Sequence, residues 1–103
     1  MRVISRRPLR EFWLIHPPAE NPLKGWFRVL ETGNFGDFNA LRTTFGAVDY
    51  VAPFTIFDVG GNKYRVVAIV HYGRKRLYVK HVFTHAEYDR WSDDMRNARR
   101  RMR

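Results

Sequence analysis

The chain has 103 residues, enough for one compact domain with a modest core, and 45% of them are hydrophobic. It contains no cysteine, which excludes disulfides, thiolate metal sites and a cysteine nucleophile, and which suits a cytoplasmic protein. No apolar run approaches the ~20 residues that span a bilayer, and the first eight residues are not followed by the apolar stretch of a secretory signal.

The charge is strongly basic, with 19 Lys and Arg against 10 Asp and Glu, a formal net charge of +9. Residues 60–103 carry twelve basic and four acidic side chains, whereas residues 1–59 are nearly balanced. Such a local excess indicates a polyanionic partner, either nucleic acid or an acidic protein. A membrane surface is a poorer fit, because a peripheral anchor would show a basic amphipathic helix with a broad apolar face.

The first part of the chain has helical periodicity. A first helix carries Leu9 and Phe12 and ends at Pro17-Pro18. Asn21 before Pro22 predicts the N-cap and first position of a second helix. The apolar stripe of this second helix comprises Leu23, Trp26, Phe27 and Leu30.

A short third helix is predicted next, with Asp37 as its N-cap and Gly46 as its end. After this helix the spacing of the apolar residues changes from that of helices to that of strands. Residues 54–59, 64–71 and 76–83 are rich in β-branched and aromatic side chains and are separated by turn signals, so they predict an antiparallel meander. Val3-Ile4 is the only other strand candidate, at an edge of this sheet.

The last predicted element is a helix with a well-defined start. Thr84 and Glu87 have the spacing of a capping box, and Phe83 and Tyr88 have that of a hydrophobic staple. Helices first, then an antiparallel sheet, then a closing helix give an α+β fold. No repeat or linker divides the chain, so we expect a single domain over 1–103, with residues 96–103 as a basic C-terminal extension that holds five arginines.

Two segments resemble the HigB branch of the RelE-like toxins. The hairpin Phe57-Asp58-Val59-Gly60-Gly61-Asn62-Lys63-Tyr64-Arg65 is similar to that family's "F-D-[VI]-G-G-N-x-[YL]-R" pattern, and Thr84-His85-Ala86-Glu87-Tyr88-Asp89 is similar to its "T-H-x-E-Y-D". The segment from Asp37 to Phe45 also looks like a helix of the family, and the resemblance extends over about residues 1–92. Either motif alone would be weak evidence, but the two at this spacing are specific.

The resemblance implies a RelE-like fold, with helices packed on a small twisted antiparallel sheet. It implies the toxin of a type II toxin–antitoxin pair, an endoribonuclease that cleaves mRNA during translation on the ribosome. The implied partners are mRNA, the ribosome and a helix-turn-helix antitoxin, and operator DNA would be bound only through the toxin–antitoxin complex. Neither a cofactor nor a metal is expected, because such an enzyme lets the 2′-hydroxyl attack the adjacent phosphate with side chains as acid, base and cations.

Four residues are candidates for this catalysis. Arg65 is expected to clamp the scissile phosphate, although an ion pair with Asp58 across the hairpin would also explain its place beside the core. His85, at the first position of the last helix, would act as a base or else be an ordinary exposed residue. Tyr88 would line the site or serve only the staple.

Lys80 is the fourth candidate, since alternation places it and His81 on opposite faces of their strand. His81 is in phase with Leu77 and Val79, which predicts a core histidine and leaves Lys80 as the phosphate contact or a solvated lysine. The residues expected to contact RNA or the ribosome are Lys63, Arg74, Lys75, Arg76, Arg99, Arg100 and Arg101. The tail arginines could instead dock on the antitoxin or remain solvated.

Two other functions fit the same composition. The basic sheet and its tyrosines, Tyr64, Tyr72 and Tyr78, would also suit a module that binds RNA or the ribosome without cutting it. A third possibility is that the basic surface exists mainly to hold an acidic protein. Loss of cleavage without loss of binding on substitution of Arg65 or His85 would distinguish an enzyme from a binder.

Overall fold

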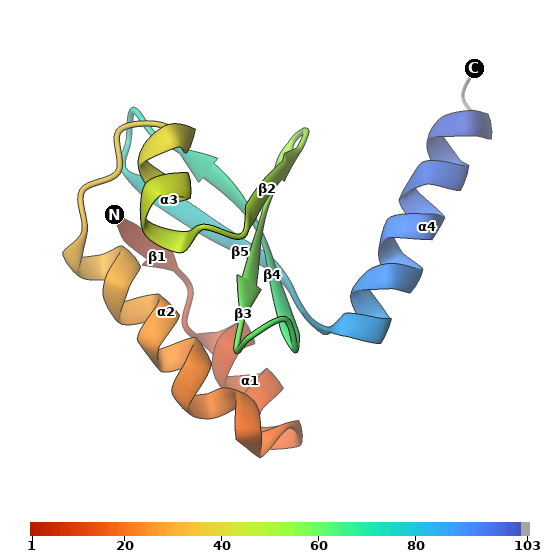
Figure 1. Ribbon diagram of the computed structural model, residues 1–103, viewed down its shortest axis with the longest axis horizontal. Helices are drawn as coiled ribbons and strands as arrows, with labels where there is room; N and C mark the ends of the chain where they lie inside the picture. The colour runs from red at the N-terminus through yellow and green to blue at the C-terminus, as the bar shows by residue number, and fades with distance from the viewer. Residues whose placement is uncertain (102–103) are drawn as a thin grey trace.

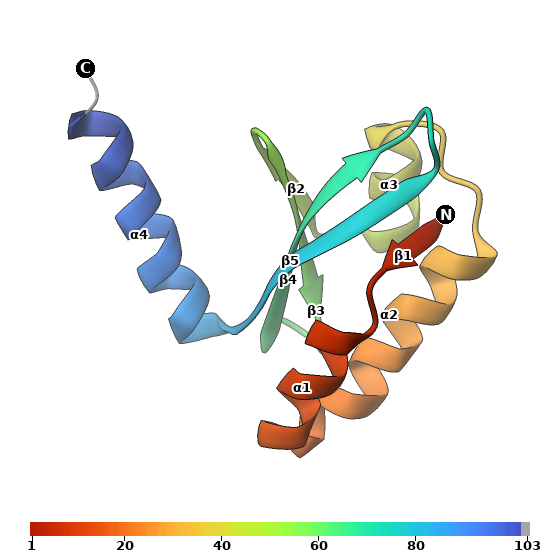
Figure 2. The ribbon, with the colours of Figure 1, turned by 180° about the vertical axis from the view of Figure 1, so that it is seen from behind.

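The computed structural model describes the backbone of residues 1–101 and the side chains of residues 1–100. A five-stranded sheet separates three N-terminal helices, on one face, from a single long C-terminal helix on the other (Figures 1 and 2). In chain order the elements are β1 (Arg2–Ile4), α1 (Arg7–Ile15), the 3₁₀ turn η1 (Pro17–Ala19), α2 (Glu20–Thr32), α3 (Phe38–Phe45), β2 (Val48–Val51), β3 (Phe54–Val59), β4 (Tyr64–His71), β5 (Arg76–Thr84) and α4 (His85–Arg101).

The sheet has the order β1-β5-β4-β3-β2. Strands β2 to β5 form an antiparallel meander, which confirms the α+β prediction and the two hairpins. β1 lies at the edge next to β5, where the sequence predicted a short strand, and it runs parallel to β5. The sheet is therefore mixed. The other edge strand, β2, was not predicted.

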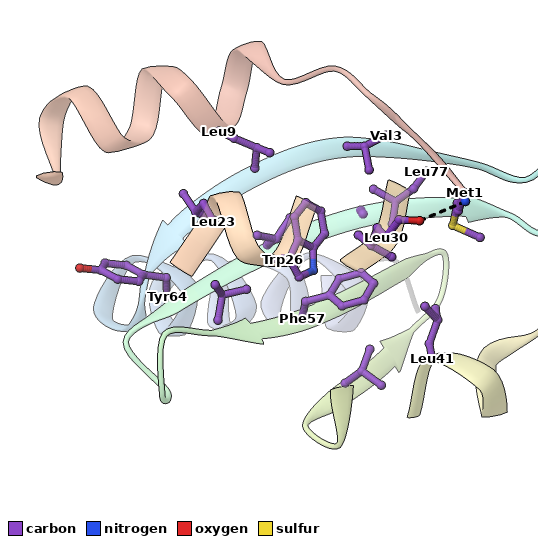
Figure 3. Packing of buried hydrophobic residues seen from close by; sticks show 14 of the residues in the cluster. Met1, Val3, Leu9, Leu23, Trp26, Leu30, Leu41, Phe57, Tyr64 and Leu77 are labelled. Carbon is purple, nitrogen blue, oxygen red and sulfur yellow. Dashed lines mark hydrogen bonds between the residues drawn. The ribbon is translucent and has the colours of Figure 1, made fainter. Parts of the chain in front are cut away.

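The hydrophobic core lies between the sheet and helices α1 and α2 (Figure 3). Trp26 of α2 packs edge to face on Phe57 of β3, with ring centroids 5.2 Å apart. Phe45 at the end of α3 packs on the same phenyl ring, also at 5.2 Å. The largest fully buried apolar residues of this layer are Leu9, Leu23, Leu30, Leu41, Phe57, Val66 and Leu77. We call this side of the sheet the core face.

The helix boundaries agree with the sequence in one place and differ in another. Asp37 caps α3 as predicted, because its carboxylate accepts a hydrogen bond from the backbone N–H of Ala40 at 2.9 Å, and Gly46 ends the helix with φ of +65°. The prediction of Asn21 as the N-cap of α2 is wrong, since α2 begins at Glu20 directly after η1. Prolines fit such a turn, because their φ is already close to helical values and the first helical N–H groups need no partner.

The start of α4 is the predicted capping box. The backbone N–H of Thr84 donates to Glu87 Oε1 at 2.8 Å, and the backbone N–H of Glu87 donates to Thr84 Oγ1 at 3.2 Å. Phe83 and Tyr88, the predicted staple pair, both pack against Trp91 in the second turn. From there α4 leads away from β5 (Figure 2), and its C-terminal half reaches the β2–β3 turn through Arg99, whose Nη2 donates to the Ala52 carbonyl at 2.6 Å.

A β-bulge in β5 changes which side chains face α4. Val79 pairs with Ala68 and His81 pairs with Val67, so Lys80 is the extra residue between two neighbouring pairs. Val79 and Val82 both pack on the core face, whereas His81 stacks on Phe83 and Trp91 on the opposite face. The prediction that His81 shares the core with Leu77 and Val79 is therefore wrong, because a bulge breaks the alternation on which it rested.

Candidate functional site

The face of the sheet opposite the core carries the polar side chains. We call it the α4 face, because the first turns of α4 lie against it. Register places Asp58, Arg65 and His81 on this face, with Asp58 opposite Arg65 and His81 opposite Val67. A pocket of about 320 Å³, which we call the Arg65 pocket, opens here; it is lined by Ala47, Val48, Asp49, Ile56, Asp58, Arg65 and Tyr88.

Arg65 is held firmly at the floor of this pocket. Its Nη1 donates to Asp58 Oδ1 at 2.9 Å and its Nη2 donates to Asn62 Oδ1 at 2.6 Å. Asn62 presents this oxygen from the β3–β4 turn, where it adopts a left-handed conformation with φ of +75°. The ion pair between Arg65 and Asp58, which was the structural explanation for the position of Arg65 beside the core, is therefore present. Only 13% of the Arg65 side chain is exposed, so an anion reaches the guanidinium only through the pocket.

Tyr88 forms the opposite wall. Its ring centroid lies 5.6 Å from the guanidinium carbon of Arg65, the geometry of a cation–π contact. Burial raises the pKa of the Tyr88 hydroxyl, and the nearby Asp49 adds to this rise, while a hydrogen bond with Ser92 and the charge of Arg65 act against it. The phenol therefore stays protonated at neutral pH, so it can donate a hydrogen bond but cannot serve as a base. The structure thus brings two of the four predicted catalytic residues together.

His85 lies beside the Arg65 pocket and not in its lining. Its Nδ1 is 3.1 Å from Asp89 Oδ2 one turn along α4, and 48% of its side chain is exposed. Its backbone N–H donates to the carbonyl of Lys63 at 3.0 Å, which ties α4 to the β3–β4 turn. A carboxylate within hydrogen-bond distance of Nδ1 orients the imidazole ring. Asp89 was not predicted as a site residue, although its i,i+4 spacing from His85 was a usable signal.

A second imidazole lies on the α4 face as a result of the bulge. The His81 ring stacks on Phe83 with centroids 5.1 Å apart and planes 12° from parallel, and Trp91 lies 5.6 Å away. Burial lowers the pKa of His81, and the charge of Lys80 lowers it further, so this ring is neutral near pH 7. Lys80 itself is exposed at the bulge. Lys80 was predicted for the site in place of His81 because unbroken alternation would put His81 on the core face.

The predicted RNA-binding residues fall into three separate groups. Lys63 lies next to His85, at the end of the sheet where the Arg65 pocket opens. The turn residues Arg74 and Lys75, with Arg76, lie beyond His71 at the opposite end of β4, about 20 Å from Arg65 at ~3.3 Å per residue.

Arg99 and Arg100 form the third group, on α4. Arg99 Nη2 donates to the Ala52 carbonyl in the β2–β3 turn at 2.6 Å, whereas Arg100 is exposed. Arg101 ends α4 and its side chain is outside the described part, as are residues 102 and 103 at the end of the predicted extension. The structure thus spreads the described members of this predicted set over three places.

Neither a metal centre nor a membrane span was identified within the described residues. No group of three His, Asp or Glu side chains there is arranged to hold a metal ion. None of the helices described combines the length and apolar character that crossing a bilayer requires.

Comparison with known proteins gives the family. A profile of the HigB toxins, described as the RelE-like toxic component of a toxin–antitoxin system, matches residues 19–91. The chain is 36% identical over 93 residues to the mRNA interferase HigB of Escherichia coli O6:H1, an alignment covering 87% of this chain and 90% of that protein. It is 30% identical over 92 residues to the mRNA interferase toxin HigB of Escherichia coli K12, covering 86% and 88%. The chain therefore belongs to the HigB family, the toxic components of toxin–antitoxin systems, and has an antitoxin as its partner.

Proposed function

We propose that this toxin is an mRNA interferase, an endoribonuclease that cleaves mRNA while the ribosome translates it. Its relatives at 30–36% identity bear that name. The observation that carries the proposal in this chain is the pairing of Arg65 with Tyr88 across an open pocket on the α4 face. A rigid guanidinium beside a neutral phenol suits a phosphodiester better than it suits an uncharged substrate.

The proposed reaction needs no metal. The 2′-hydroxyl attacks the adjacent phosphorus, and the 5′-oxygen of the next nucleotide leaves. Arg65 stabilises the charge that develops on the phosphorane, His85 oriented by Asp89 removes the 2′ proton, and Tyr88 donates a hydrogen bond within the pocket. The leaving 5′-oxygen takes up a proton from water and becomes the 5′-hydroxyl of the product. Lys80 would contact a neighbouring phosphate from the exposed bulge. The basic groups at Lys63, at Arg74–Arg76 and on α4 would hold the mRNA and the ribosome.

The partner follows from the family, and its nature is part of the proposal. We propose that the antitoxin is a helix-turn-helix protein, that operator DNA is bound only through the complex of toxin and antitoxin, and that the pair acts in the cytoplasm. The net charge of +9 supports contact with polyanions but does not distinguish RNA from an acidic protein.

The test is end-mapping of mRNA incubated with the purified toxin, with and without translating ribosomes. Attack by the 2′-hydroxyl leaves a 2′,3′-cyclic phosphate and a 5′-hydroxyl, and a 2′-deoxy nucleotide at the cut site should abolish cleavage. Arg65→Ala and His85→Ala should each lose at least about 100-fold in cleavage rate while still binding ribosomes, in the range seen when one transition-state contact is removed. Arg90→Ala, on the outer side of α4, is the matched control and should cleave normally.

The main alternative is a module that binds RNA or the ribosome without cutting it. The Arg65–Asp58 ion pair favours it, because the pair gives Arg65 a structural reason to be where it is. On that reading, Arg65→Ala lowers RNA affinity in step with folding stability, and no cut ends appear under any condition. Intact ribosome binding without any cleavage by the unmodified toxin would contradict the proposed activity.

A further inference from the structure

A second hollow continues from the Arg65 pocket along α4. It has a volume of about 160 Å³ and lies between α4 and the β2–β3 hairpin. It is lined by Val51, Phe54, Ile56, Tyr88, Trp91, Ser92, Met95, Arg96 and Arg99. We call it the α4 groove. Ile56 and Tyr88 line both hollows, so the groove begins where the Arg65 pocket ends.

The middle of the groove is aromatic. Phe54 and Trp91 meet edge to face with ring centroids 5.3 Å apart, one from the sheet and one from the helix. Both side chains are only partly buried. The groove is smaller than the roughly 300 Å³ of the smallest drug-sized ligand pockets, so it suits a single flat ring.

The far end of the groove is cationic. Among the described lining residues, Arg96 and Arg99 are the two that carry a charge. Arg99 Nη2 donates to the Ala52 carbonyl at 2.6 Å, and Arg96 pairs with Asp93 at 2.9 Å on the exposed surface of α4. An apolar, aromatic trough that ends in arginines is complementary to a nucleotide, whose base stacks and whose phosphate is anionic.

We propose that the α4 groove is a binding site for single-stranded RNA that flanks the cut, with one base stacked at Trp91 and Phe54 and its phosphate on Arg99. The inference rests on the proposed function, because it assumes that the scissile phosphate lies in the adjoining Arg65 pocket. Continuity with that pocket and the sign of the two charges favour RNA over an apolar protein segment. Stacking without hydrogen-bond readout predicts weak dependence on base identity.

The test measures binding to a fluorescent 2′-O-methyl RNA oligonucleotide, which the toxin cannot cut because it lacks the 2′-hydroxyl. Trp91→Ala should weaken binding by about tenfold, as expected for loss of one stacked base, and Trp91→Phe should recover much of it. Arg99→Glu should weaken binding and reduce its dependence on salt. Arg90→Glu makes the same charge change on the opposite side of α4, by helical periodicity, and should have a clearly smaller effect.

A scan with oligonucleotides that each lack one base identifies stacking directly. Removal of the stacked base should weaken binding of the unmodified toxin but have little further effect on Trp91→Ala, because both changes delete the same contact. Since Trp91 also contacts His81 and Phe83, circular dichroism must show that the variant folds, and Arg99→Glu carries the test if it does not.

The outcomes separate this inference from the proposed function. Normal RNA binding by folded Trp91→Ala and by Arg99→Glu would overturn the inference even if the unmodified toxin cleaves mRNA. If these variants instead lose only antitoxin binding, the groove is a protein-docking site. If RNA binding depends on Trp91 and on the presence of a base at one position of the oligonucleotide, while no cleavage is ever seen, the groove is an RNA site and the proposed activity is wrong.

Discussion

The two faces of the sheet are built for different purposes. On the core face, β3 and β4 present Phe57 and Val66, which are fully buried under three helices. On the α4 face the same strands present Asp58 and Arg65, and a single helix covers them in part. Adjacent residues of one strand thus belong to different layers. From this comparison we expect the core face to supply most of the stability, while the α4 face holds charged and half-exposed side chains beside the buried Ile56 and Val67.

The largest expected effect compares two phenylalanines of β3. Phe57→Ala removes a fully buried ring from the core face and should destabilise the protein by about 3–5 kcal/mol. Phe54→Ala removes a partly buried ring from the α4 face and should cost less than half as much. Chemical denaturation of the two variants measures the difference. Equal losses would show that the α4 face contributes to stability as much as the core does.

An intermediate effect is expected at the junction between the faces. Thr84→Ala removes the side-chain half of the capping box and should cost about 1 kcal/mol of stability. It should also reduce cleavage, because the first turn of α4 positions both His85 and Tyr88. Thr44→Ala, at an exposed position of α3, is the control and should leave stability and cleavage nearly unchanged. A Thr84→Ala variant as stable and active as the unmodified protein would mean that the contacts of Trp91 with β5 hold α4 in place without the cap.

The smallest effect concerns pH. Burial holds the pKa of His81 below that of an unfolded histidine, about 6.5, so the unfolded chain takes up a proton first as the pH falls. His81 therefore contributes a loss of stability that begins near pH 6.5 on acidification and is complete below its folded pKa. His81→Phe keeps the stacked ring and should flatten this part of the profile of unfolding free energy against pH. An unchanged profile would show that His81 is not desolvated by Phe83 and Trp91.

Much of the fold was predictable because its signals are local. The three long strands follow from residue type and turn glycines, and the caps of α3 and α4 follow from side chains that bond to their own helix. The two sequence motifs also contain Arg65 and Tyr88, which line one pocket in the structure. In each case the deciding interaction lies within a few residues of sequence.

The features that were missed depend on partners distant in sequence. β2 has only four residues, too few for a periodicity of its own, and it exists because β3 offers it an edge. The bulge at Lys80 is visible only when β5 is paired with β4, so His81 was assigned to the wrong face. The α4 groove requires the β2–β3 hairpin to approach α4, which the sequence does not indicate.

The bulge at Lys80 also means that one position of β5 is not needed for the pairing of the strand. Every other residue of β5 has a partner on β4. Deleting one of them would shift the rest of the strand by one residue, so that side chains of the core face would point to the α4 face and the reverse. Deleting Lys80 would instead join Val79 to His81 in regular pairing and leave every neighbour on its present side. When relatives are aligned with this chain, a one-residue gap in β5 is therefore compatible with the same core if it falls at Lys80. A gap elsewhere in the strand would indicate that the core is packed differently.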